Sequence, residues 1–395
     1  MHRHTIVRFV MITILLQLTI GCSSQNTRQL KVINDAIQEV KLKYAPDQRV
    51  ALFNVKARIS REEIILLGES NIGSALDELT ARLKQANIEF RDSVDQLPNA
   101  TLEGKYIGVI NNSVANLRSK PAHSAELATQ AILGTRVSTL KRQDEWYLIQ
   151  TPDDYIAWVD HGGLVLMDSL EFDSWNNSDK IIFKNVYGHV LEKASSEAPI
   201  VGDLVMGCML KWMNEEGSHY KVQYPDGRMG YVSRSEAELM SEWKKTLQPS
   251  GMMLKSIALQ LKGSPYLWGG TSTKGMDCSG FTKTVYFMNG LVIPRDASQQ
   301  VNAGIEIDKE RKFEGLEVGD LLFFGKPKTD STKRKVTHVG MWIGGNEYIH
   351  SSQMVRISSI DENVPNYDDF NKKRYLGSRR YLNNEHGNIL NIKEL

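Results

Sequence analysis

The chain has 395 residues, with 48 Lys and Arg against 47 Asp and Glu, and its formal net charge is +1. That balance gives no reason to expect nucleic acid as a partner. A hydrophobic content of 41% excludes a largely disordered chain. At roughly 100–200 residues per domain, the length predicts two to four globular units. We expect a multidomain α+β protein that is monomeric and needs no cofactor.

The first 22 residues resemble an export signal. Basic residues precede an apolar run over residues 9–20, which Gly21 and Cys22 close. A basic start, a short apolar stretch and a small residue before the cut are typical of a secretory signal. The run is also shorter than the about 20 residues that span a bilayer. We therefore predict a signal peptide over residues 1–22.

Residues 18–22, Leu-Thr-Ile-Gly-Cys, resemble a bacterial lipobox in which the usual Leu stands one place early. The resemblance implies that Cys22 becomes the lipidated first residue of the mature chain. The alternative is an ordinary cleaved signal with an incidental Cys. We expect an exported lipoprotein, anchored to a membrane through this lipid and facing the periplasm or the cell surface.

Residues 23–103 are predicted to form a small α+β domain. Apolar residues at helical spacing predict a helix over residues 28–44. Residues 49–55 and 63–67 have the apolar pattern of strands. Ser74 is a candidate N-cap for a second helix. No residue pattern in this domain indicates chemistry.

An internal repeat follows. Residues 146–159 resemble residues 219–232 at an offset of 73, and each copy has the pattern of strand, Pro-Asp turn and strand. Residues 114–121 look like the opening of a bacterial SH3 domain. We expect SH3-like β-barrels over residues 104–165 and 180–238. The alternative is one barrel and a chance match.

The last domain is predicted over residues 250–382. We expect a linking helix from Ser235 to Leu247, with Ser235 as a possible N-cap. Cys208 stands in an apolar stretch, which predicts a buried free thiol in a strand. We do not expect it to form a disulfide with Cys278.

Cys278 is the strongest candidate for chemistry. A Gly-rich loop from residue 266 onward leads into a helix, and Cys278 falls at the start of that helix. Unpaired N–H groups and the positive end of the helix dipole favour a thiolate there, and the same groups could hold an oxyanion. The alternative is a buried inert Cys, but the neighbours Asp277, Ser279 and Gly280 are not those of an apolar pocket.

A thiolate needs a base, and two histidines lie downstream. Gly344, Gly345 and Asn346 predict a hairpin turn, which would set His350 on the strand beside the one that begins near His338. One imidazole can then pair with the thiol while the other orients it. The spacing does not fix which ring does which. No Cys-x-x-Cys or His-Glu-x-x-His spacing is present, so we expect no metal site.

Four motifs in order, namely residues 277–281, 319–324 and 338–340 and then His350, resemble the NlpC/P60 family of papain-like cell-wall peptidases. The resemblance implies that Cys278 is the nucleophile, that His338 is the base and that His350 orients it. It also implies a papain-like fold, with a helix pair on an antiparallel sheet, and residues 377–382 would form a closing strand of that sheet.

The two SH3-like domains ahead of the catalytic one are similar to the layout of dipeptidyl-peptidase VI enzymes. This likeness implies cleavage of L-Ala-D-γ-Glu from stem peptides whose N-terminus is free. It also implies a set of substrate-binding residues: Tyr155, Tyr266, Trp268, Asp277, Ser279 and Asp296.

Some of these assignments leave alternatives open. The Asp277 carboxylate is suited to a free α-ammonium. Tyr155 could instead be a solvent-facing turn residue, and Asp296 could cap the next helix. Ala297 stands where the resemblance leads us to expect a hydroxyl residue, so this position supplies no hydroxyl group to the substrate.

The resemblance thus implies an endopeptidase that hydrolyses the D-γ-glutamyl–diamino acid bond of free murein peptides. Two alternatives stay open: an endopeptidase on intact peptidoglycan with wall-binding SH3-like domains, or a non-catalytic scaffold that binds wall peptides. The sequence does not fix which diamino acid follows the glutamate, the role of the N-terminal domain, or whether the SH3-like domains close the site.

Overall fold

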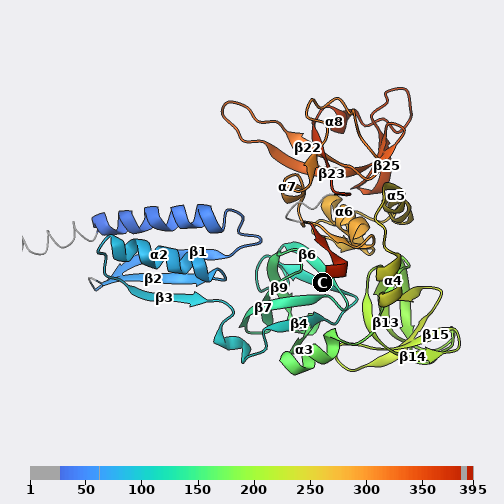
Figure 1. Ribbon diagram of the computed structural model, residues 1–395, viewed down its shortest axis with the longest axis horizontal. Helices are drawn as coiled ribbons and strands as arrows, with labels where there is room; N and C mark the ends of the chain where they lie inside the picture. The colour runs from blue at the N-terminus through green and yellow to red at the C-terminus, as the bar shows by residue number, and fades with distance from the viewer. Residues whose placement is uncertain (1–26, 62, 384–388, 395) are drawn as a thin grey trace, which may run out of the picture. The chain divides into compact units, whose positions relative to one another are not determined.

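A computed structural model of the protein describes residues 27–61, 63–383 and 389–394. The predicted signal peptide and Cys22 lie outside this part of the chain. The structure separates into two compact units, one ending at Ala100 and one beginning at Thr101 (Figure 1). Among the described residues, no helix is both long and apolar enough to cross a membrane.

The first unit packs two helices with a three-stranded sheet. The helices are residues 27–44 and α2 (Gly73–Gln85), and the strands are β1 (Phe53–Ser60), β2 (Glu63–Ser70) and β3 (Arg91–Gln96). The predicted N-cap at Ser74 is wrong, because the helix begins one residue earlier and Ile72 stands at its N-cap without a side-chain bond. The first strand begins later than expected, since the Asp47 carboxylate accepts the Arg49 N–H and turns the chain there.

The second unit begins with two sheets of seven strands. The first sheet contains β4 (Ile107–Ile110), β5 (Val114–Arg118), β6 (Leu127–Ile132), β7 (Arg136–Gln143), β8 (Trp146–Gln150), β9 (Ile156–Asp160) and β10 (Leu164–Met167). The second contains β11 (Lys180–Phe183), β12 (Tyr187–Leu191), β13 (Ile200–Val205), β14 (Met209–Glu216), β15 (His219–Gln223), β16 (Met229–Ser233) and β17 (Ala237–Leu239).

Both sheets have the same topology. The first runs β10-β4-β7-β8-β9-β5-β6, and the second has the corresponding strands in the corresponding order, β17-β11-β14-β15-β16-β12-β13. This identity confirms that the sequence repeat is a structural duplication. Among the described residues neither SH3-like sheet closes on itself, because the ladders leave β6 and β10, or β13 and β17, as edges. The Pro-Asp turn of the second copy contacts the first copy, where the Asp226 Oδ2 accepts from the Asn111 Nδ2 at 2.9 Å.

Two connecting helices differ from the sequence prediction. The helix α3 (Ser169–Asn176), which joins the two sheets, was not predicted, and Asp168 caps it by accepting the Glu171 N–H. The linking helix α4 (Met240–Thr246) is shorter than expected because β17 occupies the residues before it. Ser235 is therefore not its N-cap, and its hydroxyl bonds to that of Ser233 instead.

The C-terminal region packs two helices, α5 (Gly251–Gln260) and α6 (Cys278–Phe287), on a six-stranded antiparallel sheet. Its order is β21 (Ile305–Glu306), β26 (Tyr375–Arg380), β22 (Leu321–Lys326), β23 (Lys335–Gly344), β24 (Glu347–Ser352) and β25 (Met354–Ser359). The predicted helix pair and antiparallel sheet are confirmed. Most of the expected closing strand lies in β26, which pairs with β22. Shorter elements are β18 (Thr271–Ser272), β19 (Gly275–Met276), β20 (Leu291–Val292), α7 (Ala297–Gln300), α8 (Asp369–Lys372) and β27 (Leu390–Asn391).

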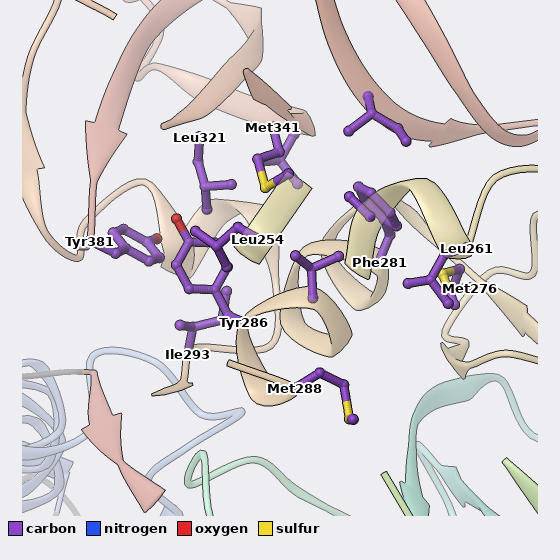
Figure 2. Packing of buried hydrophobic residues seen from close by; sticks show 14 of the residues in the cluster. Leu254, Leu261, Met276, Phe281, Tyr286, Met288, Ile293, Leu321, Met341 and Tyr381 are labelled. Carbon is purple, nitrogen blue, oxygen red and sulfur yellow. The ribbon is translucent and has the colours of Figure 1, made fainter. Parts of the chain in front are cut away.

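One apolar core holds these helices on the sheet (Figure 2). Phe281 and Leu254, from α6 and α5, are fully buried beside Leu321 and Met341 of the sheet. Burying a large side chain of this kind contributes about 1.5–3 kcal/mol. The helix that begins with Cys278 is therefore fixed on the sheet that holds both predicted histidines.

Candidate active site

Cys278 is the first residue of α6, as the sequence predicts. Asp277 is the N-cap, and its Oδ1 accepts the Gly280 N–H at 2.7 Å. The Cys278 sulfur also accepts the backbone N–H groups of Ser279 and Val339. Because Val339 directly follows His338, this contact sets the thiol beside the middle of β23.

The hairpin of β23 and β24 brings the two histidines together, as predicted. The His338 Nε2 lies 2.7 Å from the His350 Nδ1, and the His350 Nε2 lies 3.0 Å from the Ser358 Oγ. These bonds fix both rings and leave the Nδ1 of His338 as the nitrogen that can serve the thiol. The turn uses positive φ angles at Gly344, Gly345 and Asn346, which favour Gly and Asn.

The packing at Gly340 explains how His350 comes so close to its neighbours. A Cβ at this position would lie 2.8 Å from the Tyr348 Cδ2 and 3.1 Å from the His350 Cβ. Such distances would force one or both rings to move. The Val339-Gly340 pair thus has two roles, since one residue contacts the thiol and the other leaves space for the imidazole.

Burial keeps the thiol and both imidazoles uncharged. It raises the pKa of Cys278 to about 12, and the nearby Asp277 raises it further. Burial also lowers the pKa of His338 to about 4 and that of His350 to about 3. The sequence led us to expect a thiolate in the resting site. The structure does not favour it, because the cost of desolvating a thiolate outweighs its stabilisation by the helix N-terminus.

Asp277 does not have the environment that we expected from the sequence. Its Oδ1 and Oδ2 accept from the Arg295 guanidinium at 3.1 and 2.7 Å, and Oδ2 also accepts the Gly269 N–H at 3.0 Å. Arg295 is 1% exposed, and although burial opposes its charge, Asp277 raises the pKa of Arg295 above its ordinary value. The carboxylate is thus neutralised and fully bonded, so it is not open to a substrate ammonium. Ser279 is also buried, with its Oγ 3.0 Å from Arg295.

Arg295 also joins the catalytic region to the first SH3-like sheet. Its Nε donates to the Thr129 Oγ1 of β6 at 2.7 Å. The next residue of β6, Gln130, accepts at its Oε1 from the Thr271 N–H and the Ser272 hydroxyl, at 2.9 and 3.1 Å. These contacts hold the loop that leads to Cys278.

Two further contacts from the first SH3-like sheet reach predicted substrate residues. The Tyr155 hydroxyl lies 3.4 Å from the Asp296 Oδ2, and the Trp268 Nε1 donates to the Glu126 Oε1 at 2.8 Å. The alternative of a solvent-facing Tyr155 is wrong, because this residue is 7% exposed. Asp296 stands at the N-cap of α7, so the alternative that it caps the next helix is confirmed. Tyr266 and Trp268 keep 37% and 64% of their surface exposed.

Several residues of this region were missed by the sequence analysis. They are Glu126, Thr129, Gln130, Arg295 and Ser358, together with the ion pair of Lys283 and Asp153 at 2.7 Å. Arg295 stands beside Asp296 in the sequence, but a single Arg carries no signal of its partner.

Cys208 is buried and free as predicted, although it lies just before β14 rather than within a strand. In the described part of the chain, no group of three or more His, Cys, Asp or Glu residues could hold a metal ion.

Comparison with known proteins finds similar sequences over both the SH3-like and the C-terminal regions. A sequence model of the NlpC/P60 family matches residues 263–380, and one described as a bacterial dipeptidyl-peptidase Sh3 domain matches residues 117–164. A gamma-D-glutamyl-L-lysine dipeptidyl-peptidase of Bacillus cereus is 30% identical over 266 residues, which cover 65% of this chain and 76% of that protein. The chain belongs to the NlpC/P60 family.

Other relatives agree with this assignment. The dipeptidyl-peptidase 6 of Lysinibacillus sphaericus is 27% identical over 270 residues, which cover 64% of this chain and 92% of that protein. The crystal structure of an NlpC/P60 family protein from Bacillus cereus superposes with a TM-score of 0.59 at 26% identity, covering 70% of this chain and 99% of that chain. The protein is a hydrolase of the NlpC/P60 cysteine peptidase type, with an activity related to peptidoglycan.

The buried pair of Arg295 and Asp277 gives a first prediction. Arg295→Met leaves a carboxylate buried without its partner, so we expect the free energy of unfolding of the catalytic region to fall by about 3–5 kcal/mol. Urea unfolding followed by circular dichroism measures it. The double variant Arg295→Met with Asp277→Asn removes both charges and should recover part of the loss. Purely additive losses would show that the two charges are not coupled.

The lowered pKa of His338 gives a second prediction. The rate of Cys278 alkylation by iodoacetamide should stay level from pH 8 to about pH 5 and fall through about pH 4, where His338 becomes protonated. In His338→Asn the thiol keeps its raised pKa without a proton acceptor, so the rate should be low at pH 7 and rise with each pH unit above it. A wild-type alkylation rate that already falls by half near pH 6.5 would contradict the lowered pKa of His338.

Proposed function

We propose that the protein hydrolyses the D-γ-glutamyl–diamino acid bond of murein stem peptides whose N-terminal L-Ala is free. The supporting observation is the contact of Tyr155 with Asp296, which joins the first SH3-like sheet to the catalytic region at 3.4 Å. With the bond between Trp268 and Glu126, it limits the room for a sugar ahead of L-Ala. The names of the Bacillus cereus and Lysinibacillus relatives agree with a dipeptide product.

The geometry supports an assignment of roles. Cys278 is the nucleophile, His338 the general base and His350 the residue that orients it. Both oxygens of Asp277 are hydrogen-bonded to Arg295, whereas Asp296 pairs with the same guanidinium only through Oδ1 at 3.7 Å. We therefore assign the substrate ammonium to the carboxylate of Asp296, beside Tyr155. Tyr266 and Trp268 are exposed enough to contact the peptide, whereas Ser279 acts through its bond with Arg295.

The reaction follows from these positions. His338 takes the thiol proton as the Cys278 sulfur attacks the γ-carbonyl carbon of D-Glu, and N–H groups at the start of α6 stabilise the oxyanion. His338 then protonates the leaving amine, the C–N bond breaks, and a thioester remains. A water molecule gives its proton to His338 and attacks the thioester. The dipeptide leaves as its γ-carboxylic acid, and the proton returns to the sulfur.

The test compares two substrates by mass spectrometry: free L-Ala-D-γ-Glu-diamino acid-D-Ala, and the same stem joined to muramic acid. We expect release of L-Ala-D-γ-Glu from the free peptide only. Cleavage of both substrates would favour an endopeptidase of intact peptidoglycan.

Cys278→Ala should abolish cleavage, and activity that survives this change would refute the assigned nucleophile. Tyr155→Phe should raise KM for the free peptide by about tenfold, while Tyr147→Phe, on the neighbouring strand β8, should leave it unchanged.

We also propose that the protein is an exported lipoprotein, held at a membrane through Cys22. The proposal rests on the sequence of residues 1–22 alone. Cys22→Ser should move the protein from the membrane fraction to the soluble fraction and abolish incorporation of labelled palmitate, whereas Cys208→Ser should change neither. A protein that stays in the membrane fraction without Cys22 would contradict lipid anchoring at this residue.

A further inference from the structure

A cleft of about 610 Å³ lies apart from the active site. It is bounded by β7 of the first SH3-like sheet, by α3, by the start of β11, and by α4 and the C-terminal end of α6. Neither Cys278 nor either active-site histidine lines it. The proposed peptidase reaction therefore makes no use of this cleft.

Three cations line the cleft: Arg136 from β7, Lys180 from β11 and Lys244 from α4. In the part of the chain that the structure describes, no salt bridge neutralises any of them. The acidic residues on the wall are Asp154 and Asp179. Positive charge thus predominates in this cleft, although the whole chain is nearly neutral.

Two of the cations are held by aromatic side chains of α3. The Arg136 guanidinium lies 4.9 Å from the centre of the Phe172 ring, and the Lys180 ammonium lies 5.5 Å from that of Trp175. Lys180 also donates to the carbonyl oxygens of Trp175, Asn176 and Ser178. Lys180 therefore supplies a fixed charge, while Arg136 and Lys244 are placed to donate hydrogen bonds.

The positive charges also repel one another. Lys211 lies directly opposite Lys180 in the antiparallel ladder of β14 and β11. Burial, followed by repulsion from Lys244 and Lys211, lowers the pKa of Lys180 to about 8, although Asp179 opposes the shift. A bound anion would relieve this repulsion.

We propose that this cleft binds a small molecule that has two or more anionic groups, either phosphates or carboxylates. Hydroxyl groups on the wall can complete its hydrogen bonds: Thr135, Ser138, Ser178 and Ser241. Two anionic groups match the separate donors Arg136 and Lys244. The proposal does not depend on the peptidase assignment, because the cleft shares no catalytic residue with that site.

The test is isothermal titration calorimetry of the full chain at pH 7 and constant ionic strength, with two probes. Inorganic pyrophosphate represents phosphates, and tricarballylate represents carboxylates. We expect saturable binding of one molecule for at least one probe, and the tighter probe identifies the ligand chemistry. Lys244→Gln and Arg136→Gln should each weaken binding about tenfold. Lys245→Gln is the matched control, since this next residue of α4 pairs with Glu242 and should have no effect.

Two further measurements separate this site from other causes. Binding should weaken as the pH rises through about 8, where Lys180 loses its charge among Asp179, Lys211, Lys244, Arg136 and Asp154. Binding should also persist in Cys278→Ala, and all variants should keep the wild-type unfolding temperature. The proposal is overturned if neither probe saturates at millimolar concentration, if Lys245→Gln weakens binding as much as Lys244→Gln, or if Cys278→Ala abolishes it.

Discussion

The active site depends on one buried ion pair, between Asp277 and Arg295. The same carboxylate caps α6, accepts the Gly269 N–H of the preceding loop and holds a guanidinium that reaches Thr129 of the first SH3-like sheet. A buried charge pair is costly unless every partner is in place. The position of the nucleophile and the docking of the SH3-like sheet are therefore linked, because moving either would break a hydrogen bond of this buried guanidinium.

Burial also determines how the site works. Cys278 and His350 are almost inaccessible, and the resulting desolvation favours the neutral thiol and neutral imidazoles. In the proposed reaction, charge develops at the moment of attack, when the proton moves from sulfur to His338. The hydrogen bond from His338 to His350, and from there to Ser358, fixes the receiving ring without adding a carboxylate to the pair. Catalysis in such a site relies on the fixed positions of the thiol and the imidazoles more than on a thiolate that is already charged before the substrate binds.

The sequence predicted what local patterns determine. The helix that begins at Cys278, the hairpin between the two histidines and the duplicated sheet all follow from short motifs, and the structure agrees with each. The N-caps at Ser74 and Ser235 were wrong, because flanking strands and packing decide where those helices begin. The helix α3 could have been found from Asp168 and Glu171, which form a capping box. The role of Arg295 could not, since its partners lie 18 and 166 residues away along the chain.

The Pro-Asp turn occurs in both SH3-like sheets, but its contacts differ between them, so the two sheets are not interchangeable. In the first copy, Asp153 of this turn pairs with Lys283 of α6, and two residues later Tyr155 reaches Asp296. In the second copy the equivalent Asp226 bonds back to the first sheet, and Arg228 stands where the first copy has Tyr155. The two copies use the same turn as a connector, but each connector fits a different neighbour. Their order along the chain is thus fixed by side chains, and exchanging the copies would place a cation where the catalytic region meets a phenol.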